Sequence, residues 1–264
     1  MEINLNGKTA LVTGSTKGIG FAIAKSLANS GAKVIINGRT DDAANKAKAE
    51  ILASNPNANI ETAPFDLASP KGAQELFTAF PDIDILVNNL GIYGTIPFTE
   101  ISDDDWMNIL NVNVVSGARL SRFYLPKMME KNWGRIIFIS SESAINIPDD
   151  MVHYGTSKAA MQGLARGIAK VAKGSGVTCN TILPGPTMTE GVAEFLQNVM
   201  GGDGKSLDEL GREFVAKHRP SSLTGRFADP QEVANLVTYV ASPLSSSTTG
   251  AALRVEGGIV ESLI

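Results

Sequence analysis

The chain has 264 residues, of which 43% are hydrophobic, 19% charged and 6% aromatic, and this length suffices to bury a substantial core. A formal net charge of −4 argues against nucleic acid or an anionic membrane as a partner, and one cysteine with two histidines excludes an intrachain disulfide and argues against a metal site. No apolar run is long enough to cross a membrane and no signal-peptide pattern is present, so we expect a cytoplasmic protein.

Short apolar runs alternate with segments of helical periodicity along most of the chain. In chain order, strands are predicted at residues 9–14, 33–38, 58–66 (the weakest pattern), 84–89, 135–140, 177–183 and 252–258. Helices are predicted at residues 21–30, 41–54, 70–80, 104–130, 154–174 and 230–241. Because the strands are continuously apolar, they suit a parallel sheet that is covered on both faces. We therefore predict a single α/β domain over residues 1–264, a Rossmann fold with a doubly wound, seven-stranded parallel sheet and helices on both faces.

Residues 186–224 interrupt this alternation. They show no strand pattern but two amphipathic pieces, 191–200 and 207–220, joined by the glycine-rich stretch 201–206. Since ligands of open α/β sheets bind beyond the carboxyl ends of the strands, we expect this insertion to be a substrate cap. The alternatives are a surface helical hairpin and a subunit contact. Apolar residues of the first piece either line the substrate pocket or seat the cap, namely Phe195, Leu196, Val199 and Met200.

A glycine-rich turn joins the first predicted strand to the first helix. Its glycines are spaced G-x-x-x-G-x-G, which permits a tight turn and a close approach of the backbone to a diphosphate at the helix N-terminus. The strand before the turn and the helix after it favour nucleotide binding over a purely structural turn. The residues expected to bind the cofactor here are Gly14, Ser15, Thr16, Lys17, Gly18, Ile19 and Gly20.

The end of the second strand indicates which dinucleotide binds. An NAD-binding unit normally carries a carboxylate there for the ribose 2′-hydroxyl, whereas this strand ends in Asn37-Gly38-Arg39-Thr40. Arg39, joined by Lys17 from the turn, offers positive charge to a 2′-phosphate. The alternative is that both are solvated surface charges. We favour NADP(H) over NAD(H) as the cofactor.

Three residues suggest the reacting centre. Tyr154 and Lys158 are spaced i, i+4 in a predicted helix and so share one face. A nearby ammonium favours the phenolate and is expected to move the tyrosine pKa toward the working range. Ser141 follows the strand at 135–140, at the ligand-binding edge, and offers a hydroxyl to a carbonyl or alcohol oxygen. The tyrosine and lysine alone recur by chance, but chance explains the combination with Ser141 and the glycine turn poorly.

These motifs, in this order, resemble those of the short-chain dehydrogenase/reductase family over almost the whole chain. The turn matches T-G-x-x-x-G-I-G, Ser141 precedes Tyr154 and Lys158 as in the family, and N-N-A-G is present with Leu90 in place of alanine. Trp106 and Asn113 match the helix that carries the family's active-site asparagine. The residues that the resemblance adds to the cofactor site are Asp66, Leu67, Asn89, Gly91, Tyr154, Lys158, Pro184, Gly185, Thr187 and Thr189.

The resemblance implies a mechanism and an assembly. Tyr154 would be the general acid in reduction and the base in oxidation, and Lys158 would lower its pKa and hold the nicotinamide ribose. Ser141 would polarise the carbonyl, and Asn113 would hold a water in a proton relay from Lys158. Family members are commonly homotetramers, and the apolar tail at residues 260–264 suits such an interface.

Within the family the chain looks most like the bacterial 3-oxoacyl-acyl-carrier-protein reductases. At the positions of their basic carrier-protein contacts it has Asn132 and Ser175, although Arg135, Lys170 and Lys173 are near in sequence. We therefore predict NADPH-dependent reduction of a small-molecule ketone or aldehyde whose carbon skeleton is unknown. Two alternatives stay open: an NAD-linked secondary-alcohol dehydrogenase, and a dinucleotide-binding sensor without turnover.

Overall fold

The computed structural model describes residues 2–200 and 204–263 of the chain. In this described part seven strands form one sheet, and every neighbouring pair is parallel. The strands are β1 (Thr9–Val12), β2 (Lys33–Gly38), β3 (Ile60–Pro64), β4 (Ile85–Asn88), β5 (Gly134–Ile139), β6 (Val177–Pro184) and β7 (Ala252–Val255). The predicted seven-stranded parallel sheet is confirmed, including the strand with the weakest sequence pattern.

The strand order β3-β2-β1-β4-β5-β6-β7 places β1 and β4 side by side at the centre. Val12 of β1 lies opposite Ile36 of β2 on one side and opposite Val87 of β4 on the other. The chain leaves β1 toward β2 and leaves β4 toward β5, in opposite directions across the sheet. Beyond the carboxyl ends of strands at such a reversal, open α/β sheets form the crevice in which their ligands bind.

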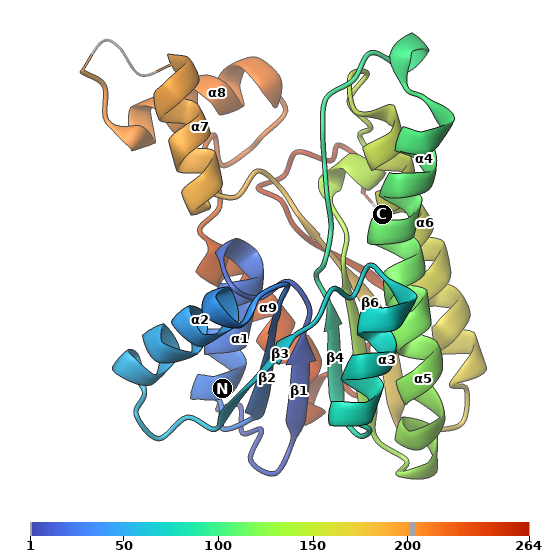
Figure 1. Cartoon of the computed structure of the whole chain (residues 1–264). Coiled ribbons are helices and arrows are strands. Elements are labelled where there is room, and N and C mark those ends of the chain that lie inside the picture. The colour runs from blue at the N-terminus through green and yellow to red at the C-terminus, as the bar shows by residue number, and fades with distance from the viewer. Residues whose placement is uncertain (1, 201–203, 264) are drawn as a thin grey trace.

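Helices cover both faces of the sheet (Figure 1). They are α1 (Gly18–Asn29), α2 (Asp41–Ser54), α3 (Pro70–Ala79), α4 (Asp103–Leu110), α5 (Ser116–Glu130), α6 (Val152–Val171), α7 (Glu190–Met200), α8 (Leu207–His218) and α9 (Pro230–Ala241). Helices α1, α2 and α9 bury side chains in the core on one face, and α3, α5 and α6 in the core on the other. The consecutive residues Ile35 and Ile36 belong to opposite cores, which explains why the strands are continuously apolar. None of the described helices is long and apolar enough to cross a membrane.

The prediction of one regular helix over residues 104–130 was wrong in one respect. A π-helical segment, Asn111–Val115, separates α4 from α5. Its wider turn carries Asn113, whose side chain bonds to the backbone of Ile92 and to Ser157. These tertiary bonds lie outside the helix, so helical periodicity gives no sign of them. Such π segments occur frequently at functional sites.

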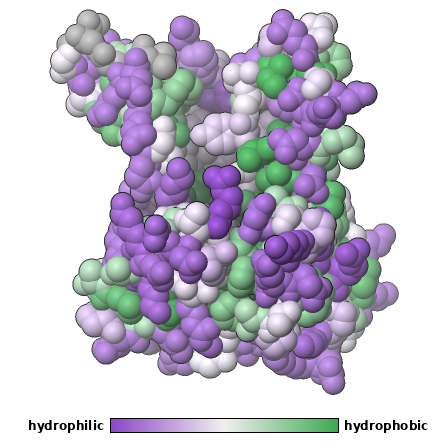
Figure 2. Space-filling view, in the orientation of Figure 1, coloured by the Kyte–Doolittle hydropathy of each residue, from purple (hydrophilic) through white to green (hydrophobic). Residues whose placement is uncertain are grey.

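Helices α7 and α8 stand beyond the carboxyl edge of the sheet, apart from the other helices (Figure 1). They share a small core whose buried members are Leu196, Leu210, Val215 and Phe227. Leu196 and Met200 therefore seat this helix pair, whereas Phe195 is 49% exposed, and the side chain of Val199 lies outside the described part. Figure 2 shows the surface hollowed between this pair and the side of the molecule that carries α4 and α6.

Candidate functional site

The turn between β1 and α1 is shaped by its glycines. Gly14 and Gly18 have φ values of 59° and 60°, in the left-handed region that favours glycine. A Cβ atom on Gly20 would lie 2.4 Å from the Gly14 carbonyl oxygen and 2.5 Å from Asn89 Nδ2, so a larger residue does not fit without a shift of the backbone. Lys17 is the N-cap residue of α1, and Ile19 packs against the core. The turn thus leads directly into the N-terminus of α1, and helix N-termini favour anions.

Asn37, at the end of β2, fixes this turn, and no sequence pattern pointed to it. Its Oδ1 accepts the N–H of Gly14 at 3.0 Å, while its Nδ2 donates to the carbonyls of Ala63 and Phe65 at 2.8 and 3.0 Å. The Ser15 hydroxyl accepts the N–H of Asn37 at 3.0 Å and donates to a β1 carbonyl at 2.7 Å. The Ser15 side chain therefore faces the protein interior rather than the crevice.

Asn89 and Gly91, in the loop after β4, border the same crevice. Asn89 Nδ2 donates to the Thr13 carbonyl at 3.0 Å, and the Thr13 hydroxyl accepts the N–H of Asn89 at 2.9 Å. A Cβ atom on Gly91 would lie 3.3 Å from Asn113 Oδ1 and 3.4 Å from Lys158 Nζ. The loops after β1 and β4 and two of the predicted catalytic residues therefore meet at one place.

Lys17 and Arg39 are both exposed at the carboxyl ends of β1 and β2. Neither side chain makes a hydrogen bond or an ion pair within the described residues, whereas the Lys17 carbonyl accepts the N–H of Phe21 at 3.3 Å. Their neighbours Thr16 and Gly38 are in contact, since a Cβ atom on Gly38 would lie 2.5 Å from Thr16 Cγ2. Lys17 and Arg39 therefore follow two residues that contact each other, and a 2′-phosphate would need cations at such a place.

Asp66 and Leu67 follow β3 and differ in exposure. The Leu67 side chain is buried in the core at 1% exposure, whereas Asp66 is exposed. Asp66 Oδ1 accepts the N–H of Ala68 at 3.2 Å, which leaves its other carboxylate oxygen open to a ligand. Of this pair, only Asp66 presents its side chain toward the solvent.

The segment after β6 packs against the carboxyl end of β7 and the loop before α9. A Cβ atom on Gly185, next to Pro184, would lie 2.7 Å from the Glu256 carbonyl oxygen. Thr187 is 6% exposed and forms a parallel bridge with Ala228. These contacts hold the segment rigidly before it continues to α7.

Thr189 and Glu190 bring the start of α7 onto the glycine turn. A Cβ atom on Gly18 would lie 3.2 Å from Thr189 Cγ2. Glu190 Oε2 accepts the N–H of Gly18 at 3.2 Å. A carboxylate of the 186–224 insertion therefore binds the helix N-terminus at which a diphosphate is expected.

Ser141 and the pair Tyr154 and Lys158 come from the end of β5 and from one face of α6. Lys158 Nζ donates to the Ile139 carbonyl at 2.9 Å and lies 5.6 Å from the Tyr154 ring centroid. The Lys158 side chain is buried, and burial lowers its pKa to about 8. The ammonium thus has one backbone partner among the described residues.

The pKa of Tyr154 is raised to about 12, and burial is the main cause. Its hydrogen bond with Ser141 lowers the pKa, the negative charge of Glu142 raises it, and the positive charge of Arg219 lowers it. The predicted lowering by Lys158 is not found in this structure, because burial prevails and the ammonium is turned to a β5 carbonyl.

Asn113 is fully buried and bonded on both sides of its amide. Its Oδ1 accepts the N–H of Ile92 at 2.8 Å, and its Nδ2 donates to the Ile92 carbonyl at 3.0 Å and to Ser157 Oγ at 2.9 Å. Both amide hydrogens are committed to protein groups, so Asn113 can offer a water only its oxygen atoms.

Two charged residues at this centre were missed by sequence reasoning. Glu142 is 3% exposed, and its Oε2 accepts the Ser141 hydroxyl at 2.5 Å. Arg219, at the C-cap of α8, donates from Nε to Glu142 Oε1 at 2.8 Å. The signal available in the sequence was an acidic residue directly after Ser141 at the end of an apolar strand.

The residues weighed for carrier-protein contacts lie at the opposite edge of the sheet. Asn132 and Ser175 precede β5 and β6, and Asn132 Oδ1 accepts the N–H of Gly176 at 2.8 Å. Arg135 is 2% exposed, and its Nε donates to the Ser242 carbonyl at 3.2 Å. Although Arg135 is near these positions in sequence, its guanidinium is buried against backbone carbonyls and is not available to a partner.

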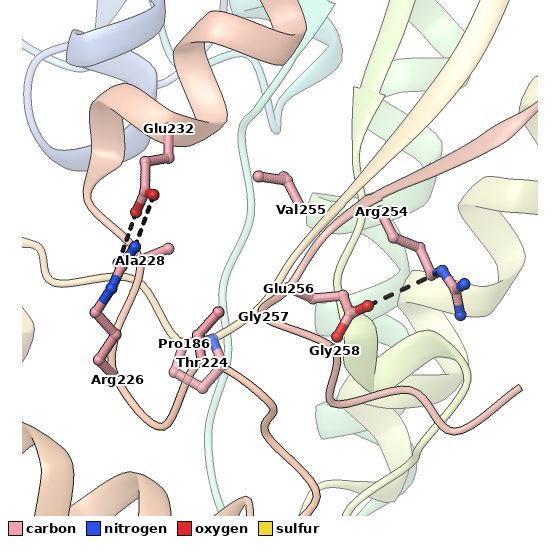
Figure 3. A pocket seen from close by; sticks show the side chains of 10 residues that line it. All are labelled: Pro186, Thr224, Arg226, Ala228, Glu232, Arg254, Val255, Glu256, Gly257 and Gly258. Atoms are coloured by element: carbon pink, nitrogen blue, oxygen red, sulfur yellow. Dashed lines mark hydrogen bonds and ion pairs between the residues drawn. The ribbon is translucent and has the colours of Figure 1, made fainter.

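A pocket opens between the carboxyl end of β7 and the loop before α9 (Figure 3). Arg226 is bonded to both carboxylate oxygens of Glu232 at 2.8 and 2.9 Å, and Arg254 Nε lies 3.9 Å from Glu256 Oε1. The charged groups of this pocket are paired with one another, and none of the predicted catalytic residues lines it.

Comparisons with known proteins agree with this geometry. The family model described as short chain dehydrogenase matches residues 8–199. The chain is 47% identical to the uncharacterized oxidoreductase YvaG of Bacillus subtilis (strain 168) over 100% of both chains, and 36% identical to the 3-oxoacyl-[acyl-carrier-protein] reductase FabG of Aquifex aeolicus (strain VF5) over 98% of this chain and 100% of that one. The crystal structure of L-sorbose reductase from Gluconobacter frateurii, complexed with NADPH and L-sorbose, superposes with a TM-score of 0.91 at 27% identity over 100% of both chains. The chain is an oxidoreductase that belongs to the short-chain dehydrogenase/reductase family.

Proposed function

We propose that the protein reduces a ketone or aldehyde with NADPH, with Tyr154 as the general acid. One observation carries the proposal: Tyr154 and Ser141 interact at the carboxyl edge of the sheet, where Ser141 lowers the pKa of Tyr154, and the loop at Gly91 brings Lys158 and Asn113 to the same place. A protein that only binds a dinucleotide needs the glycine turn but has no use for this tyrosine.

Bound NADPH would supply the hydride to the carbonyl carbon. Tyr154 donates its hydroxyl proton to the carbonyl oxygen, and Ser141 donates a hydrogen bond to that same oxygen. The Lys158 ammonium would turn from the Ile139 carbonyl toward the tyrosinate that remains and stabilise it, and the oxygens of Asn113 would hold a water through which Tyr154 regains its proton. In the direction of alcohol oxidation each proton moves back along this path.

The exposed pair Lys17 and Arg39 supports NADP(H) as the preferred cofactor, since two cations suit a 2′-phosphate. L-sorbose reductase, which shares the fold along the whole chain, was crystallised with NADPH. The close approaches at Gly20 and Gly91 hold the loops after β1 and β4 against each other and against Asn113 and Lys158, and so fix the backbone that would border the cofactor.

We further propose that residues 186–224 are a substrate cap. Helices α7 and α8 stand beyond the catalytic edge with a core of their own, which suits a part that moves as a unit. A homotetramer in the cytoplasm completes the proposal, since Cys179 is buried and suits a reducing compartment. Light scattering of the purified protein tests the assembly.

The test of the reaction is Tyr154→Phe, with Tyr239→Phe in α9 as the matched control. NADPH oxidation would be followed with nitrobenzaldehyde, ethyl acetoacetate and L-sorbose, and NADPH binding by nucleotide fluorescence. We expect Tyr154→Phe to lose about 100-fold or more in kcat while it binds NADPH as the wild type does. An active Tyr154→Phe variant would refute the role of the tyrosine, and NADPH binding without turnover in the wild type would favour the sensor.

A further inference from the structure

A buried carboxylate lies directly beside Ser141. Glu142 Oε2 accepts the Ser141 hydroxyl at 2.5 Å, the N–H of Ser143 at 2.6 Å and the Ser143 hydroxyl at 2.9 Å. Because Glu142 is 3% exposed, its charge needs compensation from the protein.

The compensating charge comes from the cap, 77 residues further along the chain. Arg219 Nε donates to Glu142 Oε1 at 2.8 Å, and Arg219 Nη1 donates to the His218 carbonyl at 2.8 Å. The Arg219 N–H caps α8 by donating to the Val215 carbonyl at 2.8 Å, and the Ser221 hydroxyl donates to the Ile259 carbonyl at 2.7 Å. The end of α8 thus orients the Arg219 guanidinium toward Glu142.

The Ser141 hydroxyl has a single proton to donate, and in this structure Glu142 accepts it. A substrate oxygen needs the same proton. We propose that Glu142 and Arg219 are positioning residues, and that their ion pair decides whether Ser141 donates to Glu142 or to the substrate oxygen, so that the docked cap completes the site. This inference rests on the proposed carbonyl reduction.

The direction of the effect follows from the charges. A carboxylate without its cation is the stronger acceptor and holds the Ser141 proton firmly. The Arg219 guanidinium draws charge toward Oε1 and so weakens the hold of Oε2 on Ser141. When the cap leaves, Arg219 leaves with it, and Glu142 keeps the proton that the reaction needs.

The same pair acts on Tyr154. The titratable or charged groups that face Tyr154 are Tyr93 after β4, Glu142 after β5, Lys158 in α6 and Arg219 from the cap. Among them Glu142 raises the pKa of Tyr154 and Arg219 lowers it. Removing one charge or the other must therefore shift the pH dependence of the reaction in opposite directions.

The experiment compares Glu142→Gln, Arg219→Met, their double variant and Arg219→Lys. Arg212→Met is the matched control, because Arg212 lies in the same helix and its Nε pairs with Asp208 Oδ2 at 3.0 Å on the exposed surface. Reduction by NADPH is measured with the best of the three carbonyl probes, and oxidation of the corresponding alcohol by NADP+ is measured across the neutral to alkaline range. Melting and NADPH binding report on folding.

We expect Arg219→Met to lower kcat roughly 10-fold to 100-fold with unchanged NADPH binding, and Glu142→Gln to change kcat much less, since a neutral amide competes more weakly for the Ser141 proton. The double variant should resemble Glu142→Gln, because without the carboxylate nothing competes for the Ser141 proton. In alcohol oxidation the rate should rise with pH as Tyr154 loses its proton. We expect this rise, the alkaline limb, to move to lower pH in Glu142→Gln and to higher pH in Arg219→Met, and to stay near the wild-type position in Arg219→Lys.

Three outcomes would each overturn the inference. The alkaline limbs of Glu142→Gln and Arg219→Met could move in the same direction or stay in place. The double variant could have a lower kcat than Arg219→Met, or Arg212→Met could lose as much kcat as Arg219→Met. If Arg219→Met fails to fold, Glu142→Gln decides through the direction of its limb. A wild type that reduces none of the probes would overturn the proposed function and this inference together. An active wild type with an inactive Tyr154→Phe variant and unaffected Arg219 variants would overturn the inference alone.

Discussion

The charge on Lys158 lowers the stability of the protein, so Lys158→Met should stabilise the fold while it abolishes turnover. Burial lowers the pKa of this lysine from 10.5 to about 8. At about 1.4 kcal/mol for each pKa unit, this lowering means that the charged lysine reduces the free energy of unfolding by about 3 kcal/mol. Methionine leaves the Ile139 carbonyl without its donor, which costs about 1–3 kcal/mol. A net gain of up to about 2 kcal/mol remains near neutral pH.

The gain should depend on pH with a definite sign. Between about pH 8 and 10.5 the unfolded chain binds the Lys158 proton and the folded chain does not, so the stability of the wild type rises with pH. The advantage of the variant is therefore complete below about pH 8 and disappears above about pH 10.5.

Urea unfolding at neutral and at alkaline pH measures this difference, and a melting scan should show a rise of about 2–4 °C for each kcal/mol. Lys170→Met is the control, because Lys170 is exposed on the same helix and its replacement should change stability by less than about 0.5 kcal/mol. A Lys158→Met variant that is less stable than the wild type at neutral pH, or equally favoured at alkaline pH, would refute the reasoning.

Three further predictions concern the cofactor. Glu190→Gln should tighten NADPH binding about threefold to tenfold at low salt, with a smaller effect at high salt, because it removes an exposed negative charge from the N–H of Gly18; weaker binding in a fluorescence titration would contradict this. Arg39→Ala should raise the KM for NADPH at least about tenfold and leave that for NADH nearly unchanged. Gly38→Asp alone should weaken both cofactors, since its Cβ would meet Thr16 Cγ2 at 2.5 Å, whereas adding Thr16→Ala should yield an NADH-preferring enzyme in steady-state assays.

Local signals in the sequence located most of the elements. The helices α2 and α9 begin and end where they were predicted, because Thr40 caps one and Asp229 with Pro230 begins the other. The break between α4 and α5 was missed, since the bonds of Asn113 that accompany it reach residues 21 and 44 positions away. Helical periodicity reports only on neighbours within a turn or two.

The residues of the candidate site likewise fall into those that sequence motifs identify and those that only the fold reveals. The family motifs named Ser141, Tyr154 and Lys158, and the structure brings them to one edge of the sheet. Asn37 and Glu142 were missed, because their importance depends on partners that only the fold brings near: Gly14 lies 23 positions before Asn37, and Arg219 lies 77 positions after Glu142. A carboxylate in a sequence is normally a surface charge, and only burial makes it informative.

The cap contacts the rest of the protein with opposite charges at its two ends. Glu190 begins α7 and binds the glycine turn, and Arg219 ends α8 and binds Glu142 beside Ser141. Between these ends the shared core that contains Leu196 ties the two helices together, so a displacement at one end is transmitted to the other. In the proposed enzyme a diphosphate at the glycine turn would compete with Glu190, and a substrate oxygen would compete with Glu142 for the Ser141 proton. Occupancy of the cofactor site and readiness of Ser141 would then be linked through α7 and α8.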